Sequence, residues 1–359
     1  MPAALTLLLA AASPIAPAVP NPPQQQLLRW QVESIRCGDR AVTPLAAPRP
    51  LSGLLWGPAD PQPITFTFRI DATGRALSIA PAPARYVPSS EDLGPALAAA
   101  RFAPGEALAG CTITYRAEAV PLADADLIEL MAYTIDPISG RLPQAGWDRI
   151  RTPDSDCLRP PYPKPLLRAY PDFDTIAGSP GERSWTMIGY DLTGSGTPVN
   201  VRTIAGTANR ALDAAGRKAI VASRFTAGAR TGCLYPYWHA ATPIAAPVAP
   251  EEASFGTTPN CPAAPWVQPP RLTYPGAWNR RSIEGWAVVT YDVAPWGDVG
   301  NVRVLASEPA TAFGEQALQV IRSARRAPSP TGASGCIDRV LFKIRSNGMP
   351  ADPNTAPIY

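Results

Sequence analysis

The sequence contains few of the residue types from which most enzymes build active sites. Only one of its 359 residues is histidine, His239, and it directly follows the aromatic run Leu234–Trp238. A Ser-His-Asp triad would have to use this histidine, and the sequence has no Gly-x-Ser-x-Gly motif for a nucleophile elbow. A single histidine among aromatic residues is typically structural. We therefore expect no enzyme, no catalytic residue and no small-molecule substrate.

Clustered positive charge and metal-binding motifs are also missing. The formal net charge is only +3, and the lysines (Lys164, Lys218 and Lys343) are scattered. No basic stripe suggests a nucleic-acid partner. The six cysteines include no Cys-x-x-Cys pair, so the sequence predicts no zinc site, no other metal and no cofactor. With 45 prolines and 17% charged residues, it favours two or three small domains with proline-rich connectors over one large core.

Long apolar runs are absent as well. The stretch Ala3–Ala12 is shorter than the roughly 20 residues that span a bilayer. Together with the Ala- and Pro-rich residues after it, this stretch predicts a signal peptide and Pro/Ala-rich start over 1–23. The stretch lacks Lys and Arg at its beginning, so an uncleaved anchor and a disordered cytosolic tail remain alternatives. We expect export to the periplasm, with membrane association if the segment is retained.

The clearest pattern in the chain lies between Ile283 and Ile344. Residues 287–293 alternate between apolar and polar, a turn cluster follows at 294–298, and β-branched residues resume at 299–305. Two such runs around a Gly-, Pro- and Asp-containing turn predict a β-hairpin. Apolar residues then recur at helical spacing over 311–325, and 336–344 reads as a third strand. The stretch is therefore predicted to be an α+β unit with the order β-β-α-β.

This stretch resembles the TonB C-terminal domain, the periplasmic module of bacterial energy transducers. The features that match are Tyr274-Pro275, Ile283-Glu284-Gly285, Gly297, Val299, Asn301-Val302, Ser307, the helix at 313–326 and Val340–Ile344. Two features depart from the family pattern: Arg325-Arg326-Ala327-Pro328 lacks an aromatic residue, and Gln268-Pro269 lies six residues before Tyr274.

The resemblance implies how the domain binds. In this family the last strand captures the TonB box of an outer-membrane receptor by strand addition, in support of transport across the outer membrane. The resemblance therefore implies an outer-membrane receptor or another envelope protein as partner. Because no segment is as long as an anchor helix, coupling to an inner-membrane motor would need a separate protein. The implied peptide-binding residues are Ile337, Arg339, Val340, Leu341, Phe342, Lys343 and Ile344, with Gln268 as a weaker candidate.

The same order of patterns appears twice more, which predicts three tandem β-β-α-β units, each a small antiparallel sheet packed on a helix. We call them the first segment (27–120), the second segment (157–240) and the third segment (261–345). A connector (121–156) with a helix at 125–133 and a Pro/Ala linker (241–260) separate them, and a disordered tail is expected at 346–359. We expect these proline-rich stretches to act as semi-rigid spacers that hold the segments apart.

The cysteines follow the same threefold pattern. The separations Cys37 to Cys111, Cys157 to Cys233 and Cys261 to Cys336 are 74, 76 and 75 residues. This spacing favours these pairs among the fifteen possible pairings, and an exported protein is in a compartment where disulfides persist. Six buried free thiols are the alternative.

Two functional readings stay open. The first is peptide binding at an edge strand; the second is a structural or assembly protein of the envelope that reuses the fold without binding a TonB box. Asp71, Asp191 and Asp292 recur at the end of the first strand of each hairpin, so we interpret them as hairpin residues, where Asp favours turns.

Overall fold

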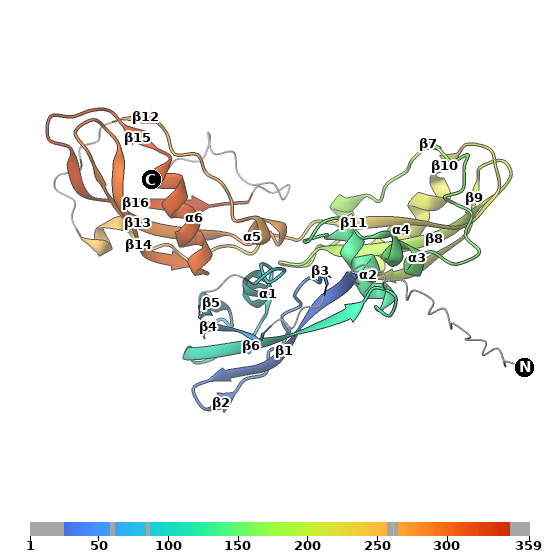
Figure 1. Cartoon of the computed structure of the whole chain (residues 1–359), viewed down its shortest axis with the longest axis horizontal. Helices are drawn as coiled ribbons and strands as arrows, with labels where there is room; N and C mark the ends of the chain where they lie inside the picture. Colours follow the sequence, from blue (N-terminus) through green and yellow to red (C-terminus); the bar gives the residue numbers. More distant parts are fainter. Residues whose placement is uncertain (1–24, 58–61, 84–86, 257–260, 262–264, 345–359) are drawn as a thin grey trace, which may run out of the picture.

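The computed structural model describes residues 25–57, 62–83, 87–256, 261 and 265–344. The signal peptide expected at 1–23 and the tail expected at 346–359 lie outside the described residues. Figure 1 shows three lobes, with the first segment below the junction of the other two. In the described ranges the sheets are built from antiparallel strand pairs and few helices accompany them, which fits the α+β class.

The first segment contains a larger sheet than expected. Its strands pair in the order β2-β1-β6-β4-β5, and β3 pairs with β1. The prediction of a three-stranded sheet was wrong here because β1 adds to the free side of β6. The elements are β1 (Gln25–Cys37), β2 (Arg40–Ala41), β3 (Gly53–Trp56), β4 (Ile64–Ile70), β5 (Ala76–Ala82), α1 (Leu93–Ala99) and β6 (Leu108–Pro121).

The second segment has a three-stranded sheet, β11-β8-β9, and a separate two-stranded ladder, β10-β7. Helix α4 begins after Asn209, whose side chain accepts a hydrogen bond from the Leu212 amide at 3.1 Å. This N-cap satisfies one of the unpaired donors of the first turn. The elements are β7 (Pro165–Leu167), η1 (Phe173–Thr175), β8 (Ser184–Leu192), β9 (Pro198–Gly206), α4 (Arg210–Ala222), β10 (Arg224–Phe225) and β11 (Arg230–His239).

The third segment has the sheet β14-β13-β16 and the two-stranded ladder β12-β15. Helix α6 buries Phe313, Ala317, Val320 and Ile321, which confirms the amphipathic helix that its apolar spacing predicted. The two-stranded ladders of the second and third segments were not predicted. The elements are β12 (Trp266–Gln268), α5 (Gly276–Arg280), β13 (Gly285–Val293), β14 (Val299–Glu308), α6 (Thr311–Arg322), β15 (Arg325–Arg326) and β16 (Ala333–Phe342).

One turn geometry recurs in all three segments. The hairpin glycines Gly74, Gly196 and Gly297 have φ of 81°, 77° and 97°. A Cβ on any of them would lie 2.1 Å from the backbone oxygen of a residue three or four positions after the end of the helix, which is Phe102, Phe225 or Arg326. Only glycine permits both this φ and this close approach. The glycine before each second cysteine (Gly110, Gly232 and Gly335) also has a positive φ.

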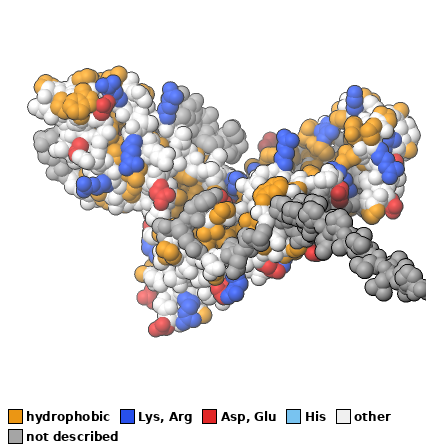
Figure 2. All heavy atoms as spheres, viewed as in Figure 1, with side chains coloured by type: hydrophobic (Ala, Val, Ile, Leu, Met, Phe, Trp, Pro, Cys, Tyr) orange, Lys and Arg blue, Asp and Glu red, His pale blue; other side chains and the backbone are white. Residues whose placement is uncertain are grey.

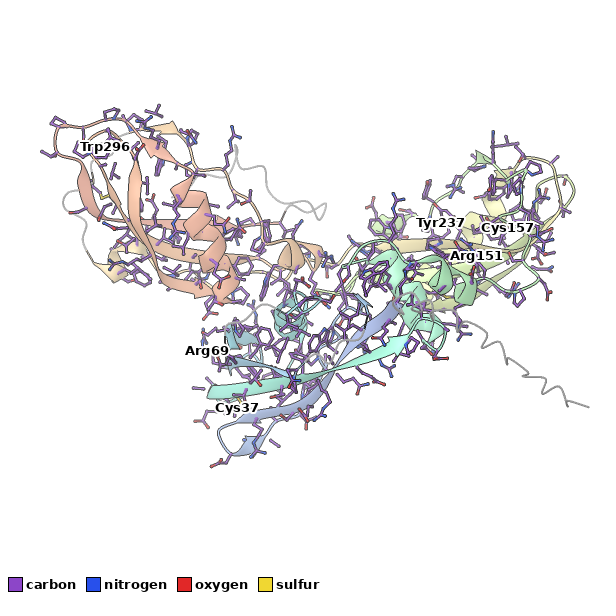
Figure 3. The ribbon with its side chains drawn as sticks, in the orientation of Figure 1. Cys37, Arg69, Arg151, Cys157, Tyr237 and Trp296 are labelled. Carbon is purple, nitrogen blue, oxygen red and sulfur yellow. A yellow bond between two sulfur atoms is a disulfide. The ribbon has the colours of Figure 1, made fainter. Side chains whose placement is uncertain are left out.

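Three disulfides join Cys37 to Cys111, Cys157 to Cys233 and Cys261 to Cys336. These are the pairs that the spacing favours, and none of the described cysteines is free. Each bond links the lead-in of its segment to the strand after the helix; Cys37 and Cys157 are labelled in Figure 3. No disulfide joins two different segments.

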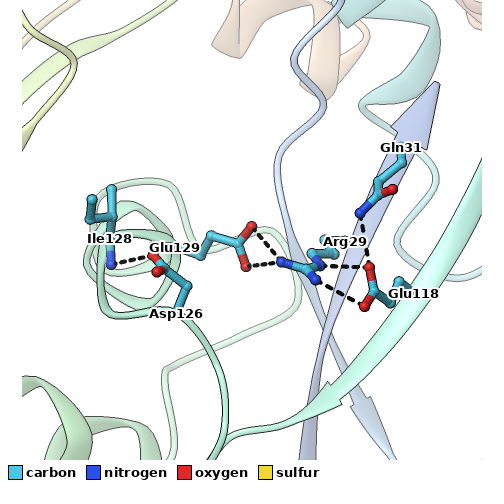
Figure 4. Close-up of polar contacts among 6 residues, drawn as sticks. All are labelled: Arg29, Gln31, Glu118, Asp126, Ile128 and Glu129. Carbon is cyan, nitrogen blue, oxygen red and sulfur yellow. Dashed lines mark hydrogen bonds and ion pairs between the residues drawn. The ribbon is translucent and has the colours of Figure 1, made fainter.

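The connector is packed against the sheets. It contains α2 (Leu127–Ile135), near the predicted helix, and α3 (Gln144–Ile150). Leu130 and Met131 of α2 share a core with Trp185 and Met187 of β8. Arg29 of β1 bridges Glu118 of β6 at 2.9 Å and Glu129 of α2 at 3.2 Å (Figure 4). The connector therefore joins the first two segments.

The linker is packed as well, so the prediction that both stretches act as spacers was wrong. Ile244 is buried and forms a parallel bridge with Ile283. The Trp286 indole donates a hydrogen bond to the Pro247 carbonyl at 2.9 Å. A short turn, η2 (Glu252–Phe255), follows. Helix α6 covers only one face of the central strand β13. Trp286 and Val288 point to the other face and are buried there because the linker covers it.

Candidate functional site

Strand β16 lies at one side of the third sheet. It pairs with β13 from Gly285 opposite Phe342 to Val293 opposite Ala333. In the described ranges no strand pairs with its other side. A strand in this position offers unpaired amides and carbonyls to an incoming chain.

The opposite side of the same sheet is partly covered by the first segment. The Ile79 amide of β5 donates to the Pro309 carbonyl at 2.9 Å, and Ile79 forms a parallel bridge with Ala310. The Ser78 amide donates to Glu308 of β14 at 2.6 Å, and Arg69 pairs with that carboxylate at 2.8 Å. The end of β14 is thus docked on β5, whereas the turn η2 of the linker lies against β16.

The side chains of β16 and of the two residues after it, Lys343 and Ile344, divide between the two faces. Val340, Phe342 and Ile344 are buried, and the Phe342 ring packs against Phe313 of α6 with centroids 5.2 Å apart. Ile337, Arg339 and Leu341 are half-buried on the other face, and Lys343 is exposed. The inward side chains therefore serve the core, so any binding role falls to the backbone.

The charged side chains of β16 already have partners. Arg339 donates to the Pro250 carbonyl at 3.2 Å and lies 3.9 Å from Glu251. Lys343 pairs with Glu284 at 2.8 Å, and the other oxygen of that carboxylate accepts a hydrogen bond from the Ile344 amide at 3.1 Å. These contacts hold the linker and the start of β13 against β16.

Gln268 is not part of the β16 edge. It lies on β12, opposite Arg325 of β15, and its side-chain amide donates to the Ser323 carbonyl at 2.7 Å. The structure therefore places this candidate at the end of α6.

Tyr274 has a structural role that sequence reasoning missed. Its hydroxyl donates to the Ile283 carbonyl at 2.7 Å, and its ring packs edge-on against Phe342 with centroids 5.6 Å apart. Burial raises the pKa of the Tyr274 hydroxyl. Tyr274 thus fixes the start of β13 relative to the end of β16.

Arg326 replaces the aromatic residue that the family pattern leads one to expect after the helix. Its guanidinium lies 3.7 Å from the Trp266 ring centroid and donates to the Tyr291 hydroxyl at 2.8 Å. The Tyr291 hydroxyl in turn donates to Asp338 of β16 at 2.7 Å. Burial raises the pKa of Asp338. The stack of Arg326 on Trp266 therefore stands where the other segments have a ring–ring contact, Phe68 with Phe102 and Tyr190 with Phe225.

The corresponding edges of the other segments differ. Strand β6 is covered by β1 from Gln26 opposite Pro121 to Cys37 opposite Cys111. Strand β11 pairs with β8 on one side, and no described strand pairs with its other side.

The remaining sequence candidates have local contacts. His239 Nδ1 lies 2.8 Å from the Ala240 carbonyl. Asp191 and Asp292 each accept two hydrogen bonds, from Asn200 and Gly232 and from Asn301 and Gly335, so they tie the hairpin to the last strand. Asp71 caps its own turn through Thr73 and Arg75. No helix in the described ranges combines the length and apolar character that membrane crossing requires.

Comparison with known proteins concerns the third segment. Over 71 residues the chain is 38% identical to Protein TonB of Escherichia coli (strain K12). This match covers 20% of the chain and 29% of that protein, so the chain spans under a third of the relative's length. Residues 270–344, which include β16, match the family model of the Gram-negative bacterial TonB protein C-terminal.

Proposed function

We propose that the third segment is a TonB-like module that binds an extended peptide by strand addition to β16. The observation that carries this proposal is the position of β16: it is an edge strand of a three-stranded sheet, with no described strand on its outer side, inside the stretch that matches the TonB C-terminal family. Main-chain hydrogen bonds would supply the affinity, and the half-buried outward side chains would supply selectivity.

We further propose that all three segments derive from one module. The recurrent hairpin glycine, the glycine–cysteine step and the disulfide in each segment support this common origin. The first segment would then have lost its acceptor edge, because β1 occupies it.

The partner in this proposal is an outer-membrane receptor or another envelope protein, and the location is the periplasm. The match to a TonB C-terminal model and the disulfides support an envelope location, since disulfides persist in oxidising compartments. The function would support transport across the outer membrane, with energy delivered through a separate protein. We propose no catalytic activity.

The test uses the full chain and a labelled peptide carrying the TonB box of an outer-membrane receptor. Leu341 of β16 lies opposite Trp286 of β13, and at the same place in the second segment Trp238 of β11 lies opposite Trp185 of β8. The backbone amide and carbonyl of Trp185 bond to Thr207 rather than to β11. We therefore expect the Leu341 amide to point away from β13. Leu341→Pro should remove an edge donor and weaken binding by about tenfold or more.

Two controls separate the backbone from the side chain. Leu341→Ala keeps the amide and should bind within about threefold of the unaltered chain, within the net value of one hydrogen bond. Leu305→Pro places proline in the bulge between the Val288–Ala306 and Val289–Val304 pairs of the opposite edge and should bind normally. Thermal unfolding monitors the fold of each variant. Equal binding by Leu341→Pro and Leu341→Ala would contradict strand addition, and absence of peptide binding would favour the structural alternative.

A further inference from the structure

A hollow of about 460 Å³ lies beside the unpaired side of β11 in the second segment. It is bounded by the strand itself, by the lead-in segment and by the start of the linker (240–243), and most of its large side chains are aromatic. The residues that carry the argument are Tyr170, Phe173, Asp174, Tyr235, Pro236 and Trp238. None of these residues belongs to the β16 site.

The backbone of β11 offers fewer donors at this edge than that of β16. Trp185 of β8 uses its amide and its carbonyl on Thr207, at 3.0 Å each, so it does not bond to β11. Trp238 lies opposite Trp185, and Pro236 lies two residues before Trp238. Backbone groups two residues apart point to the same side of a strand, so the backbones of Trp238 and Pro236 face away from β8. Proline has no amide to give. A continuous ladder to an added strand is therefore interrupted at the middle of this edge.

Among the aromatic side chains of the hollow, that of Tyr170 is turned to the outside, whereas Arg168 stacks on Tyr235 and Arg183 stacks on Trp238. Tyr170 is 62% exposed and meets Tyr237 edge-on, with ring centroids 6.2 Å apart. The Tyr237 hydroxyl donates to the Ala169 carbonyl at 2.9 Å, which fixes the lead-in beside β11 (Figure 3). Tyr274, the residue at the same place in the third segment, is instead packed into the core. The ring of Tyr170 is thus exposed and lines the hollow, whereas the equivalent ring of Tyr274 is packed inside the third segment.

One negative side chain lines the hollow and one positive side chain lies beside it, stacked on the lining residue Tyr235. The Arg168 guanidinium lies 4.2 Å from the Tyr235 ring centroid, and Asp174 is an exposed lining residue near Phe173 and His239. Neither forms an ion pair within the described parts of the chain. On the face drawn in Figure 2, positive and negative side chains are interspersed. A ligand complementary to this hollow carries an acidic group at one end and a basic group at the other.

We propose that this hollow binds a proline-rich segment of a partner protein in the polyproline II conformation, with an acidic residue beside Arg168 and a basic residue beside Asp174. Aromatic-lined grooves receive such segments because the polyproline helix is preformed and needs few main-chain bonds. The interrupted donor row and the exposed tyrosine fit this ligand better than a regular strand. The site goes beyond the proposed function, because it lies on another segment and takes another ligand.

The test measures binding of the full chain to a fluorescent peptide, Glu-Pro-Pro-Leu-Pro-Pro-Lys, by anisotropy. Saturable binding is expected, with Tyr170→Ala weakening it about tenfold. Tyr162→Ala is the matched control, because Tyr162 is an exposed tyrosine of the same segment that does not line the hollow; it should bind normally. A peptide with Glu at both ends should bind more weakly, since one end would face Asp174.

Several results would overturn the proposal. These are no saturable binding, equal affinity of Tyr170→Ala and Tyr162→Ala, or tighter binding after removal of residues 1–24, which would identify this chain's own start as the occupant. Peptide-sensitive dimerisation in sedimentation would identify a second copy instead. Leu341→Pro should leave this peptide's affinity unchanged, and Tyr170→Ala should leave TonB-box binding unchanged, so failure at either site is distinguishable from failure at the other.

Discussion

Arg281 of the third segment and Asp92 of the first form a two-pronged ion pair, with Nε–Oδ1 and Nη2–Oδ2 distances of 2.7 and 2.5 Å. Their side chains are only 5% and 1% exposed. Arg281 also donates to the carbonyl of Arg49 in the first segment and to that of Gly181 in the second. One guanidinium therefore contacts all three segments.

Replacement of Arg281 should destabilise the whole chain. Arg281→Met leaves the Asp92 carboxylate buried without its cation, and we expect the free energy of unfolding to fall by about 3–5 kcal/mol. The Arg281→Met/Asp92→Leu double variant should lose less, because no unpaired charge remains. Urea denaturation measures both. Arg116→Met, which breaks an exposed contact with Glu33, is the control and should change stability by under about 1 kcal/mol. A single variant as stable as the unaltered chain would contradict this role.

A Cβ at Gly297 should damage the third segment. Gly297→Ala combines φ of 97° with a Cβ position 2.1 Å from the Arg326 oxygen. Strain of this kind costs on the order of 1–3 kcal/mol before the clash is counted. Gly300→Ala is the matched control, because no atom lies within 4 Å of its added Cβ. Thermal unfolding should separate the two variants clearly; similar melting temperatures would show that the turn can rearrange.

Loss of one disulfide should weaken the segment that contains it. Cys261→Ala with Cys336→Ala opens a loop with a sequence separation of 75 residues. Removal of a native disulfide from a small exported domain typically costs about 2–5 kcal/mol. Urea denaturation of the double variant, followed by tryptophan fluorescence, measures the loss. Non-reducing peptide mapping of the same variant should still show the Cys37–Cys111 and Cys157–Cys233 links; exchanged partners would contradict three independent bonds.

Acid should weaken the Asp292 contacts. Hydrogen bonds from Asn301 and then from the Gly335 amide lower the pKa of Asp292. A lowered pKa in the folded state means that the carboxylate stabilises the fold above its unfolded pKa of about 3.9. This contribution is lost as the pH falls through the lowered value. The stability difference between the unaltered chain and Asp292→Asn should therefore shrink from pH 5 downward.

Asn301→Gly offers a direct check on the cause of that shift. Asn301 has φ of 50°, which glycine tolerates, so the substitution removes the donor without straining the backbone. The pKa of Asp292 should rise toward its ordinary value in a carbon-detected NMR titration of the carboxyl group. An unchanged pKa would assign the shift to the Gly335 amide alone.

Local patterns in the sequence were sufficient for the hairpins, the helix after each hairpin and the cysteine pairs, but not for α3 and α5. Alternation along Phe66–Ile70, helical spacing along Phe313–Ile321 and equal spacing of the cysteines depend on neighbouring residues or on simple repetition, so they can be read without knowing the fold. The choice of β16 as the binding strand came from the resemblance to the TonB C-terminal domain, and Gln268, the weaker candidate from the same resemblance, does not belong to that edge.

Contacts between distant stretches were decided only by the tertiary structure. Strand β1 carries too many polar residues to signal a core strand. It nevertheless pairs with β6, on the side of β6 that β4 leaves unpaired. The linker looks like a spacer by composition, yet it packs on the third sheet because a single helix buries only one of the two apolar faces of β13. The aromatic residues of 234–239 are visible in the sequence, but their hollow exists only because Tyr237 fixes Ala169 beside them. Whether a sheet edge remains accessible depends on which distant segments pack against it, and local periodicity in the sequence does not predict those contacts.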